Sequence, residues 1–483
     1  MRQRCNHIHV HPISMNTKIT QQEGGIRRVL RISIPLVLAT SGHALRLFAD
    51  RVMLSQYAPE ALAAAMPAGL TAFCLMAFFI GTAGYASTFV SQYTGAGQPH
   101  KTGAAIWQAI WIALVGGILV GTTAHFAEAI TGWMQHGEAV QAYQIPYYET
   151  LVQLSFSAIL LAALNAFWSG RGHTRVVMGI ELFTAALNVV LNHALIFGHY
   201  GFPELGISGA GLATGISSLG GCIIAMGLFL LPANRQRFGT WPRKIIQPQL
   251  LMRILRFGIP NGTQFSLELI AFNLFVIFLG RFGAAELEAA NIAFGLNALA
   301  FLPLVGLGMA ASILVGQCVG AGQIPLAKRY VSIAVRLSIG YNAIIGTLML
   351  TVPHLLIALF VREGDTAQAE ALRLSVIYMR FIAAYLFFDG IFIIYSHAIR
   401  GAGDTRFAMV AGLLLSWLTL SIPAWGLQRF SPSAMPLWYL LVGHIMLAGI
   451  IFGWRYRQGA WTHMRVVEEI PTYEVDTHAE GGV

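Results

Sequence analysis

The chain has 483 residues, of which 56% are hydrophobic and only 11% are Asp, Glu, Lys or Arg. An ordinary soluble protein carries roughly 25% charged residues, and a chain of this length has a large surface to cover. The composition therefore excludes a water-soluble globular protein and indicates a protein that lies largely in lipid. The formal net charge is +9. Because the basic residues form short clusters between apolar segments, as at a cytoplasmic membrane face, we expect no nucleic-acid partner.

The beginning of the chain, residues 1–25, precedes any long apolar segment. It holds His7, His9 and His11 in alternation, but three alternate histidines alone do not make a closed metal site, and we expect a disordered tail. It shows no signal-peptide pattern. The four cysteines are far apart in the sequence, so we expect neither a disulfide framework nor a thiolate metal site.

Twelve apolar segments are each long enough to cross a hydrocarbon layer about 30 Å thick, which takes about 20 helical residues. In lipid every backbone polar group needs an internal partner, so these segments predict helices rather than an open sheet. We expect an all-α integral membrane protein with twelve transmembrane helices, which cover approximately residues 32–54, 62–87, 104–125, 147–168, 177–198, 208–231, 254–279, 287–316, 330–352, 372–398, 407–427 and 437–455.

The basic residues divide unequally between the two sets of loops. If both termini lie in the cytoplasm, most of the 30 Lys and Arg residues fall on inner loops, and outer loops hold only Arg281, Arg362, Arg373 and Arg429. Excess positive charge marks the cytoplasmic side of a membrane protein. We therefore expect a multi-pass protein of the plasma (inner) membrane with both termini in the cytoplasm.

The second half of the chain repeats the first. Arg28, Arg31 and Ile34-Pro35 recur 225 positions later at Arg253, Arg256 and Ile259-Pro260, and Gly95-Ala96-Gly97-Gln98 recurs with the same spacing at Gly320-Ala321-Gly322-Gln323. Gly172-His173-Thr174-Arg175 is echoed 231 positions later by Gly403-Asp404-Thr405-Arg406. Each half therefore has six spans. Because six is even, both halves enter the membrane from the same side, which predicts two lobes related by a pseudo-two-fold axis along the membrane normal.

We expect the chain to divide into five segments. These are an N-terminal tail (1–25), an N-lobe with spans one to six (26–231), a cytoplasmic linker (232–249), a C-lobe with spans seven to twelve (250–457) and a cytoplasmic C-terminal tail (458–483). The linker is basic and rich in proline, with no apolar run. Two lobes around a central cavity suit alternating access, so the repeat favours a transporter over a channel.

Several motifs resemble those of the multidrug and toxic compound extrusion (MATE) family, over residues 26 to 457. They are Ile34-Pro35 followed by Asp50, the paired Gln-x-x-Gly-Ala-Gly loops at 92–97 and 317–322, the segment Gly206-Ile207-Ser208-Gly209-Ala210-Gly211-Leu212-Ala213-Thr214, and the turn Arg400-Gly401-Ala402-Gly403-Asp404-Thr405-Arg406. The resemblance implies a cation-coupled antiporter that expels organic, often cationic, compounds. It is greatest to the NorM-type branch, in which acids at the positions of Asp50, Glu268 and Asp389 serve ion coupling. A second branch has Asp where this chain has Asn192, so the sequence departs from that branch's amino-lobe sodium site.

Four acids lie within the expected spans, namely Asp50, Glu181, Glu268 and Asp389. A charged side chain near the bilayer centre costs on the order of 3 kcal/mol, so each acid needs a partner or a function. Glu268 and Asp389 lie mid-span in one lobe with no arginine one turn away, and we expect both to serve cation coupling. With nearby oxygen atoms they could hold Na⁺ or share a proton, and the sequence leaves the choice of ion open.

Five further polar side chains lie on the same helix faces as these acids or on a similar polar stripe. We expect them to line the substrate cavity; they are His43, Asn188, Asn261, Gln264 and Tyr385.

Arg46 lies one turn before Asp50 and is unexpected for the MATE family. The two side chains could neutralise each other as an i, i+4 pair, which leaves both a structural and a coupling role open for Asp50. Glu181 lies near the cytoplasmic end of span five, where it could line the cavity or pair with Arg171 or Arg175.

We expect a secondary transporter rather than an enzyme, because the chain has no GxxxxGK[ST] phosphate loop and no HExxH or GxSxG motif. No cofactor is expected apart from Na⁺ or H⁺ as the coupling ion, and the expected partners are organic small molecules and membrane lipid. Twelve helices in two lobes can enclose a pathway, so we expect a monomer. The alternative is a lipid-linked saccharide flippase, whose pyrophosphate would need cavity arginines, and Arg46 and Arg380 leave that alternative open. A channel or a structural membrane protein is a third class.

Overall fold

The computed structural model describes residues 25–134, 137–242, 244–357 and 368–468. Most of the two expected tails therefore lies outside the described residues, as does Arg362. Among the described residues, twelve helical segments are long and apolar enough to cross a membrane.

The first half of the chain supplies six of these spans. Their helices are α1 (Ile26–Tyr57), α2 (Pro59–Gly84) continued by α3 (Ala86–Gly95), α4 (Thr102–Thr122) followed by α5 (Ala127–Gly132), α6 (Glu138–Gln153) continued by α7 (Ser155–Gly170), α8 (Thr174–Phe197) and α9 (Gly206–Phe229). The short helix α10 (Pro232–Phe238) follows them.

The second half supplies the other six. They are α11 (Pro248–Gly280), α12 (Ala284–Gly320), α13 (Ile324–Thr351) followed by α14 (Pro353–Ile357), α15 (Gln368–Ala402), α16 (Thr405–Leu414) continued through the π-helical η5 (Leu415–Ser421) into α17 (Ile422–Phe430), and α18 (Met435–Gln458).

All twelve expected spans are present, which confirms the predicted fold class. The helices extend beyond the apolar segments because their polar end turns continue the backbone hydrogen bonding. Proline begins and glycine ends several of them: Pro248 lies in the first turn of α11, and Gly198 follows α8 with a φ of 71°. Both residues suit these positions, since proline lacks an N–H that the first turn does not need and glycine adopts positive φ without strain.

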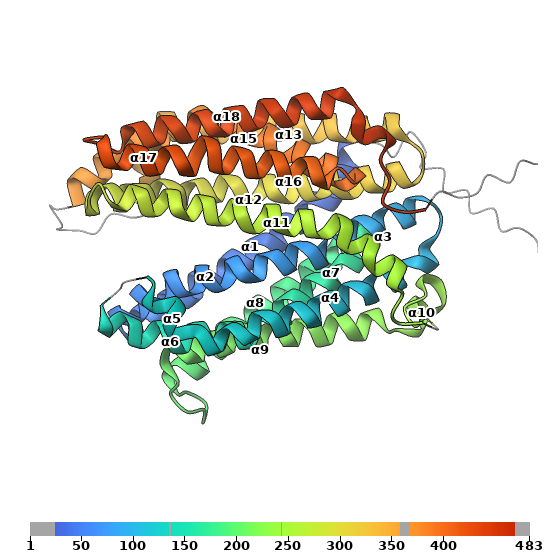
Figure 1. The fold of residues 1–483 in the computed structure, drawn as a ribbon, viewed down its shortest axis with the longest axis horizontal. Coiled ribbons are helices and arrows are strands. Elements are labelled where there is room, and N and C mark those ends of the chain that lie inside the picture. The colour runs from blue at the N-terminus through green and yellow to red at the C-terminus, as the bar shows by residue number, and fades with distance from the viewer. Residues whose placement is uncertain (1–24, 135–136, 243, 358–367, 469–483) are drawn as a thin grey trace, which may run out of the picture.

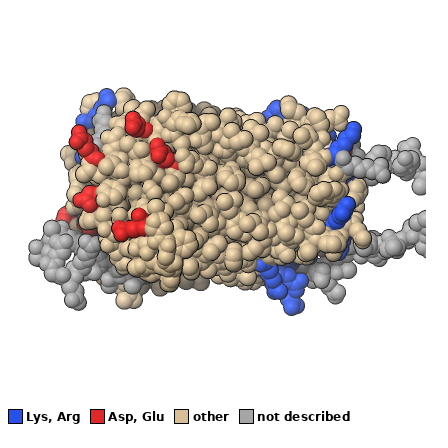
Figure 2. Space-filling view, turned by 90° about the horizontal axis from the view of Figure 1, so that it is seen from below, with Lys and Arg blue, Asp and Glu red and all other residues tan. Residues whose placement is uncertain are grey.

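The twelve spans form two bundles, the N-lobe and the C-lobe, which lie side by side (Figure 1). On the face seen in Figure 2, acidic side chains gather at one end of the molecule and basic side chains gather mainly at the other, with an uncharged band between them. We call these the acidic end and the basic end. The end of α3, the α7–α8 turn and α10 lie at the basic end (Figure 1). An uncharged band between two charged ends is the surface expected of a protein that crosses a bilayer.

Four clusters of buried apolar side chains make up the core. The two near the basic end each draw on both lobes: one joins the N-lobe to Leu250 and Ile254 of α11, and the other joins the C-lobe to Val29 and Ile32 of α1. Of the two near the acidic end, one consists only of C-lobe residues and the other only of N-lobe residues. The lobes therefore share a core at the basic end and have separate cores at the acidic end.

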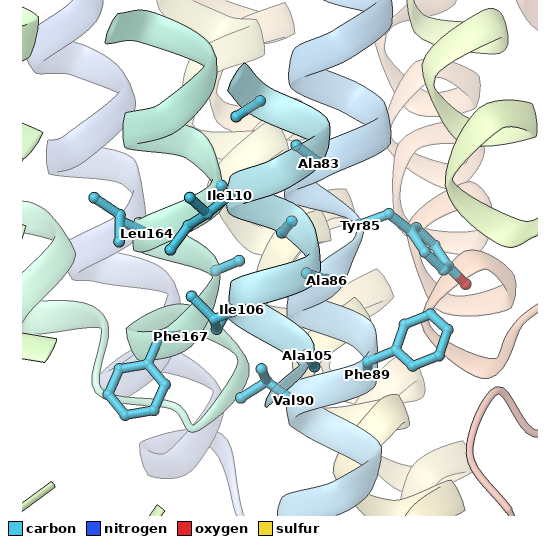
Figure 3. Packing of buried hydrophobic residues seen from close by; sticks show 14 of the residues in the cluster. Ala83, Tyr85, Ala86, Phe89, Val90, Ala105, Ile106, Ile110, Leu164 and Phe167 are labelled. Atoms are coloured by element: carbon cyan, nitrogen blue, oxygen red, sulfur yellow. The ribbon is translucent and has the colours of Figure 1, made fainter. Parts of the chain in front are cut away.

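Aromatic side chains at the α2–α3 junction and on α3 carry part of this shared core. Figure 3 shows Tyr85 and Phe89 turned away from α4 and α7 and toward the C-lobe. The hydroxyl of Tyr85 donates to the carbonyl of Arg400 at 2.7 Å, and the rings of Phe89 and Phe257 lie with their centroids 6.2 Å apart.

The paired Gln-x-x-Gly-Ala-Gly motifs meet each other across the two lobes. A Cβ atom at Gly95 would overlap the backbone carbonyl of Gln317, and a Cβ atom at Gly320 would overlap that of Gln92. The glutamine side chains repeat the symmetry: Gln92 donates to the carbonyl of Gly401 at 3.1 Å, and Gln317 donates to that of Gly170 at 3.0 Å. We call this reciprocal contact the interlock.

The segment after α18 crosses from the C-lobe to the N-lobe at the basic end. The backbone N–H of Val466 donates to the side-chain oxygen of Gln92 at 2.8 Å. Glu468 forms ion pairs with Arg253 and with Lys101, the latter at 3.5 Å. Partial burial opposes ionisation of Glu468, but the hydrogen bond and the charges of these two cations outweigh it and hold its pKa below the usual value. The segment therefore adds to the contact between the lobes.

The linker is more ordered than a plain connection. It contains α10, and its carbonyls at Thr240 and Ile245 accept hydrogen bonds from Trp107 and Gln108 of α4, at 2.9 Å and 2.8 Å. The sequence of the linker does not show these contacts with α4, because they use the backbone carbonyls of the linker and not its side chains.

We predict that Gly95→Ala separates the lobes at the basic end, because the new methyl group would occupy the position of the Gln317 carbonyl. Spin labels on His100 and Lys328, which are exposed on different lobes, would show longer distances by double electron–electron resonance in a cysteine-free background. Gly340→Ala is the matched control, because a Cβ atom there meets nothing within 4 Å. The same distance distribution in both variants would contradict the prediction.

Candidate functional site

Asp50 lies inside the N-lobe among amide and hydroxyl groups. Its carboxylate accepts a hydrogen bond from the side chain of Asn192 on α8. Asn192 also donates to Asn188 at 3.1 Å, and Asn188 donates to the hydroxyl of Thr214 on α9 at 3.4 Å. Asp50 is 5% exposed and both asparagines are 0% exposed. Asp50 and Asn188, both predicted as site residues, are thus brought together in one buried polar network.

Two members of this network, Asn192 and Thr214, were not predicted as site residues. Asn188 and Asn192 are four residues apart on α8, so the helix places both on the face that meets α1. Thr214 is a polar residue in the small-residue segment that begins α9. That contrast in composition was the signal that could have identified it.

Arg46 does not pair with Asp50. Its guanidinium forms an ion pair with Glu181 at 3.3 Å, and the two side chains are 10% and 16% exposed. Asn165 of α7 donates to the other carboxylate oxygen of Glu181 at 2.8 Å. Both sequence-based suggestions, an Arg46–Asp50 pair and pairing of Glu181 with the arginines at the basic end, are therefore wrong. The partners are 135 positions apart and meet only because α1 packs against α8.

This ion pair changes the environment of Asp50. With Arg46 paired to Glu181, the direct side-chain contact of Asp50 is an uncharged amide. The buried side-chain oxygen of Asn192 has no hydrogen-bond partner among the described residues. A carboxylate with amide and hydroxyl oxygens nearby is a set of hard ligands that suits a small cation.

Glu268 lies in the C-lobe on α11. Gln264, one turn earlier, donates to its carboxylate at 2.9 Å. A Cβ atom at Gly412 of α16 would lie 2.6 Å from the same oxygen atom, so α16 approaches this carboxylate closely only because residue 412 is glycine. Gln264 is 1% exposed. These contacts confirm that Gln264 and Glu268 share a helix face.

Arg400 supplies a cation to this part of α11. It donates to the side-chain oxygen of Asn261 at 3.3 Å and interacts electrostatically with Glu268. It was expected on an inner loop, yet it ends α15 with its side chain directed between helices. The sequence of α11 has no arginine within a turn of Glu268. The cation comes from a different helix, which helical spacing along α11 cannot show.

Asp389 lies on α15 and is 7% exposed. Within the described residues, its carboxylate has no hydrogen bond or ion pair, and neither does it contact the carboxylate of Glu268. At the neighbouring Gly390 a Cβ atom would overlap the hydroxyl of Ser338 and lie 2.6 Å from the amide nitrogen of Asn342, both on α13. In this conformation the structure does not bring the two predicted C-lobe acids together.

The predicted cavity residues do not form one open wall. Asn188 and Tyr385 are 0% and 2% exposed and lie inside their lobes. Asn261 donates to the carbonyl of Gly81 at 2.8 Å, so it joins the lobes, while His43 is exposed. Helical spacing shows which residues share a face, but it cannot show whether that face meets the other lobe, the interior of its own lobe or open space.

The described residues contain no group of three or more His, Cys, Asp or Glu side chains arranged to hold a metal ion. The arrangement instead consists of single buried or half-buried acids, and Asp50 and Glu268 each accept a hydrogen bond from an uncharged amide. Such acids can take up one monovalent cation or one proton, and no covalent chemistry is suggested by their surroundings.

Comparison with known proteins agrees with these features. The MatE family model matches residues 35–194 and 260–424, so the two matched regions fall in the two lobes. The protein named "Probable multidrug resistance protein NorM" from Pseudomonas syringae pv. tomato is 30% identical over 424 residues, covering 85% of this chain and 90% of the relative. "Multidrug resistance protein PmpM" from Pseudomonas aeruginosa is 27% identical over 474 residues, covering 95% and 96%.

Solved structures share the fold. A structure described as the outward-facing conformation of a multidrug resistance MATE family transporter superposes with a TM-score of 0.81 at 19% identity, covering 92% of this chain and 99% of the other. A transporter of the MOP superfamily from Pyrococcus furiosus also has a TM-score of 0.81, at 18% identity, covering 90% and 96%. Together with the matched family model, the twelve spans and the repeated interlock motifs, these comparisons establish that the chain is a NorM-like member of the MATE family of membrane transporters and not an enzyme.

Proposed function

We propose that this protein exports organic, often cationic, compounds in exchange for Na⁺ or H⁺, by alternating access of its two lobes. One observation carries the proposal: the lobes are joined by the interlock at the basic end, while each has its own core at the acidic end. Such lobes can open at the basic end and close at the acidic end as rigid bodies, without unfolding. The relatives named as multidrug resistance proteins support the substrate class.

We propose that ion and substrate compete for buried carboxylates. Asp50 in the N-lobe, and Glu268 and Asp389 in the C-lobe, attract an organic cation while they are ionised. Binding of Na⁺ or H⁺ neutralises them, which removes that attraction and lowers the cost of closing a low-dielectric space around them. A ligand shifts a conformational equilibrium only through its different affinities for the two states, and the ionised and neutral acids supply that difference.

The charge distribution supports an orientation. The excess of Lys and Arg at the basic end favours placing that end in the cytoplasm of a plasma (inner) membrane. The described conformation would then be closed toward the cytoplasm by the interlock. In that conformation an ion from outside reaches the acids, and substrate has already left.

The flippase alternative loses its support from Arg46. A lipid pyrophosphate needs unpaired arginine side chains, whereas Arg46 is bound to Glu181. Arg380 is exposed on α15, and one arginine is a weak basis for pyrophosphate recognition. We therefore propose export of organic compounds in preference to lipid flipping.

The acids are tested by Asp50→Asn, Glu268→Gln and Asp389→Asn. We predict that each variant reduces ion-driven export of a fluorescent organic cation from inverted vesicles, because the amide cannot gain or lose the coupling ion. Assays with and without a Na⁺ gradient, over a pH series, identify the ion.

Glu60→Gln is the control, since Glu60 is exposed at the start of α2. Retention of ion-driven export by both Glu268→Gln and Asp389→Asn would show that the carboxylate mechanism is wrong. Export that needs neither ion would instead point to a different energy source.

Arg46 and Glu181 are predicted to stabilise each other. Removing one partner of a largely buried ion pair leaves an uncompensated charge and costs about 3 kcal/mol. We expect Arg46→Gln and Glu181→Gln each to lower the thermal unfolding temperature in detergent, and the double variant to lose less than the sum of the two. Additive losses would contradict the pairing. An Arg46→Gln variant of full stability that no longer binds substrate would instead make Arg46 a binding residue.

The orientation is tested by reporter fusions. A green fluorescent protein fused after residue 483 should fluoresce in cells, because it folds in the cytoplasm, and alkaline phosphatase at the same position should be inactive. Alkaline phosphatase inserted after Gly201, in the turn between α8 and α9, should be active. The opposite pattern would reverse the proposed orientation.

A further inference from the structure

A cavity of about 450 Å³ opens at the basic end of the N-lobe. It lies between the start of α1 and the α7–α8 turn. Its charged lining consists of Arg28, Arg31, Arg171 and Arg175, together with His173, and no carboxylate from the described part of the chain lines it. The transport mechanism proposed above uses none of these residues.

Arg171 is held rigidly at this cavity. Its guanidinium carbon lies 3.9 Å from the centre of the Phe167 ring and 4.0 Å from that of Phe238, a residue of α10. Two of its nitrogen atoms, Nε and Nη1, are buried without a hydrogen-bond partner in the described part of the chain. Desolvation and the charge of Arg237 lower the pKa of Arg171 to about 10, so it stays cationic at neutral pH. Buried donors of a cation are costly to leave unpaired, and an anion beside them would remove that cost.

The helix α8 begins at the same cavity. Its first residue, Thr174, is 1% exposed, and its hydroxyl has no partner among the described residues. His173 precedes it without a side-chain cap. The free N–H groups and the positive dipole of a helix N-terminus attract anions. Three kinds of donor therefore converge here: guanidinium groups, a hydroxyl and backbone N–H groups.

The repeat shows that this cluster is a property of the N-lobe alone. In the C-lobe, Arg253, the counterpart of Arg28, pairs with Glu468. Asp404, the counterpart of His173, binds Arg455 at 2.8 Å. In the N-lobe no ion pair with a carboxylate involves the four arginines of the cavity, as far as the described residues extend. Two of the C-lobe positions thus take part in ion pairs with a carboxylate, whereas their N-lobe counterparts at this cavity do not.

We propose that this cavity binds a phosphate group. Arginine side chains bind phosphate oxygens through paired N–H donors, and the volume exceeds that of a single phosphate, which leaves room for the group that carries it. Two sources share this chemistry: the headgroup of an anionic phospholipid at the membrane surface and a soluble phosphate monoester. The site lies beside the interlock, because Gln317 of the C-lobe donates to the carbonyl of Gly170, which directly precedes Arg171.

The test uses the purified full-length protein, stripped of lipid in detergent. Native mass spectrometry measures binding of phosphatidylglycerol, with zwitterionic phosphatidylcholine for comparison, and isothermal titration calorimetry measures binding of glycerol 3-phosphate. Arg175→Gln removes one exposed arginine of the cavity and is expected to weaken binding about tenfold, since a hydrogen bond to a charged group contributes roughly 1.5 kcal/mol or more. Arg406→Gln is the matched control, because Arg406 is the exposed repeat counterpart of Arg175.

A second variant, Arg171→Lys, keeps the charge but loses the planar group that contacts the two rings, and should also weaken binding. Binding of phosphatidylglycerol alone assigns the site to lipid, and binding of glycerol 3-phosphate assigns it to a soluble phosphate monoester. Either result, with a loss in Arg175→Gln and none in Arg406→Gln, supports the proposal. Equal affinity of wild type and Arg175→Gln for both probes, or equal losses in Arg175→Gln and Arg406→Gln, would overturn it.

Discussion

The close approach of two backbones at the interlock is the constraint on which the rest of the structure depends. Gly95 and Gly320 lie where any side chain would overlap the carbonyl of the opposing glutamine, and the two contacts are related by the internal repeat. Because the contact uses backbone atoms on both sides, it demands one relative position of the lobes. It therefore defines a closed basic end, while the separate cores at the acidic end leave the lobes independent there. The C-terminal segment reinforces the closed end, since Val466 binds Gln92 of the interlock itself.

The two lobes repeat each other in fold but use their charges differently. In the N-lobe Arg46 forms an ion pair with Glu181, and Asp50 accepts its hydrogen bond from an uncharged amide. In the C-lobe the cation near Glu268 is Arg400, which also receives the hydroxyl of Tyr85 on its carbonyl. A half-buried carboxylate is thus connected to the closed end through one residue. Neutralising that carboxylate would change an interaction of Arg400, which gives the proposed ion coupling a physical route to the lobe contact.

Much of the fold was predictable, because lipid imposes strong constraints on sequence. Twelve apolar segments, the repeat spacing and the loop charges follow from periodicity and composition, and Glu268 with Gln264 followed from helical spacing. The partner of Arg46 was not predictable, since Glu181 is distant in sequence and meets it only through the packing of α1 on α8. The sequence also could not show that the side chains of Asn188 and Tyr385 lie inside their own lobes. The repeated Gln-x-x-Gly motifs were visible, but their contact across the lobes required the three-dimensional arrangement.

The central claim is that the two ends of the lobes open and close in opposition. Double electron–electron resonance in lipid vesicles, with one label pair spanning the lobes at the basic end and another at the acidic end, tests it most directly. The account predicts that adding the coupling ion and adding a transported organic cation shift the two distances in opposite directions, one lengthening as the other shortens. Distances at both ends that stay constant during measured transport, or that lengthen together, would contradict it.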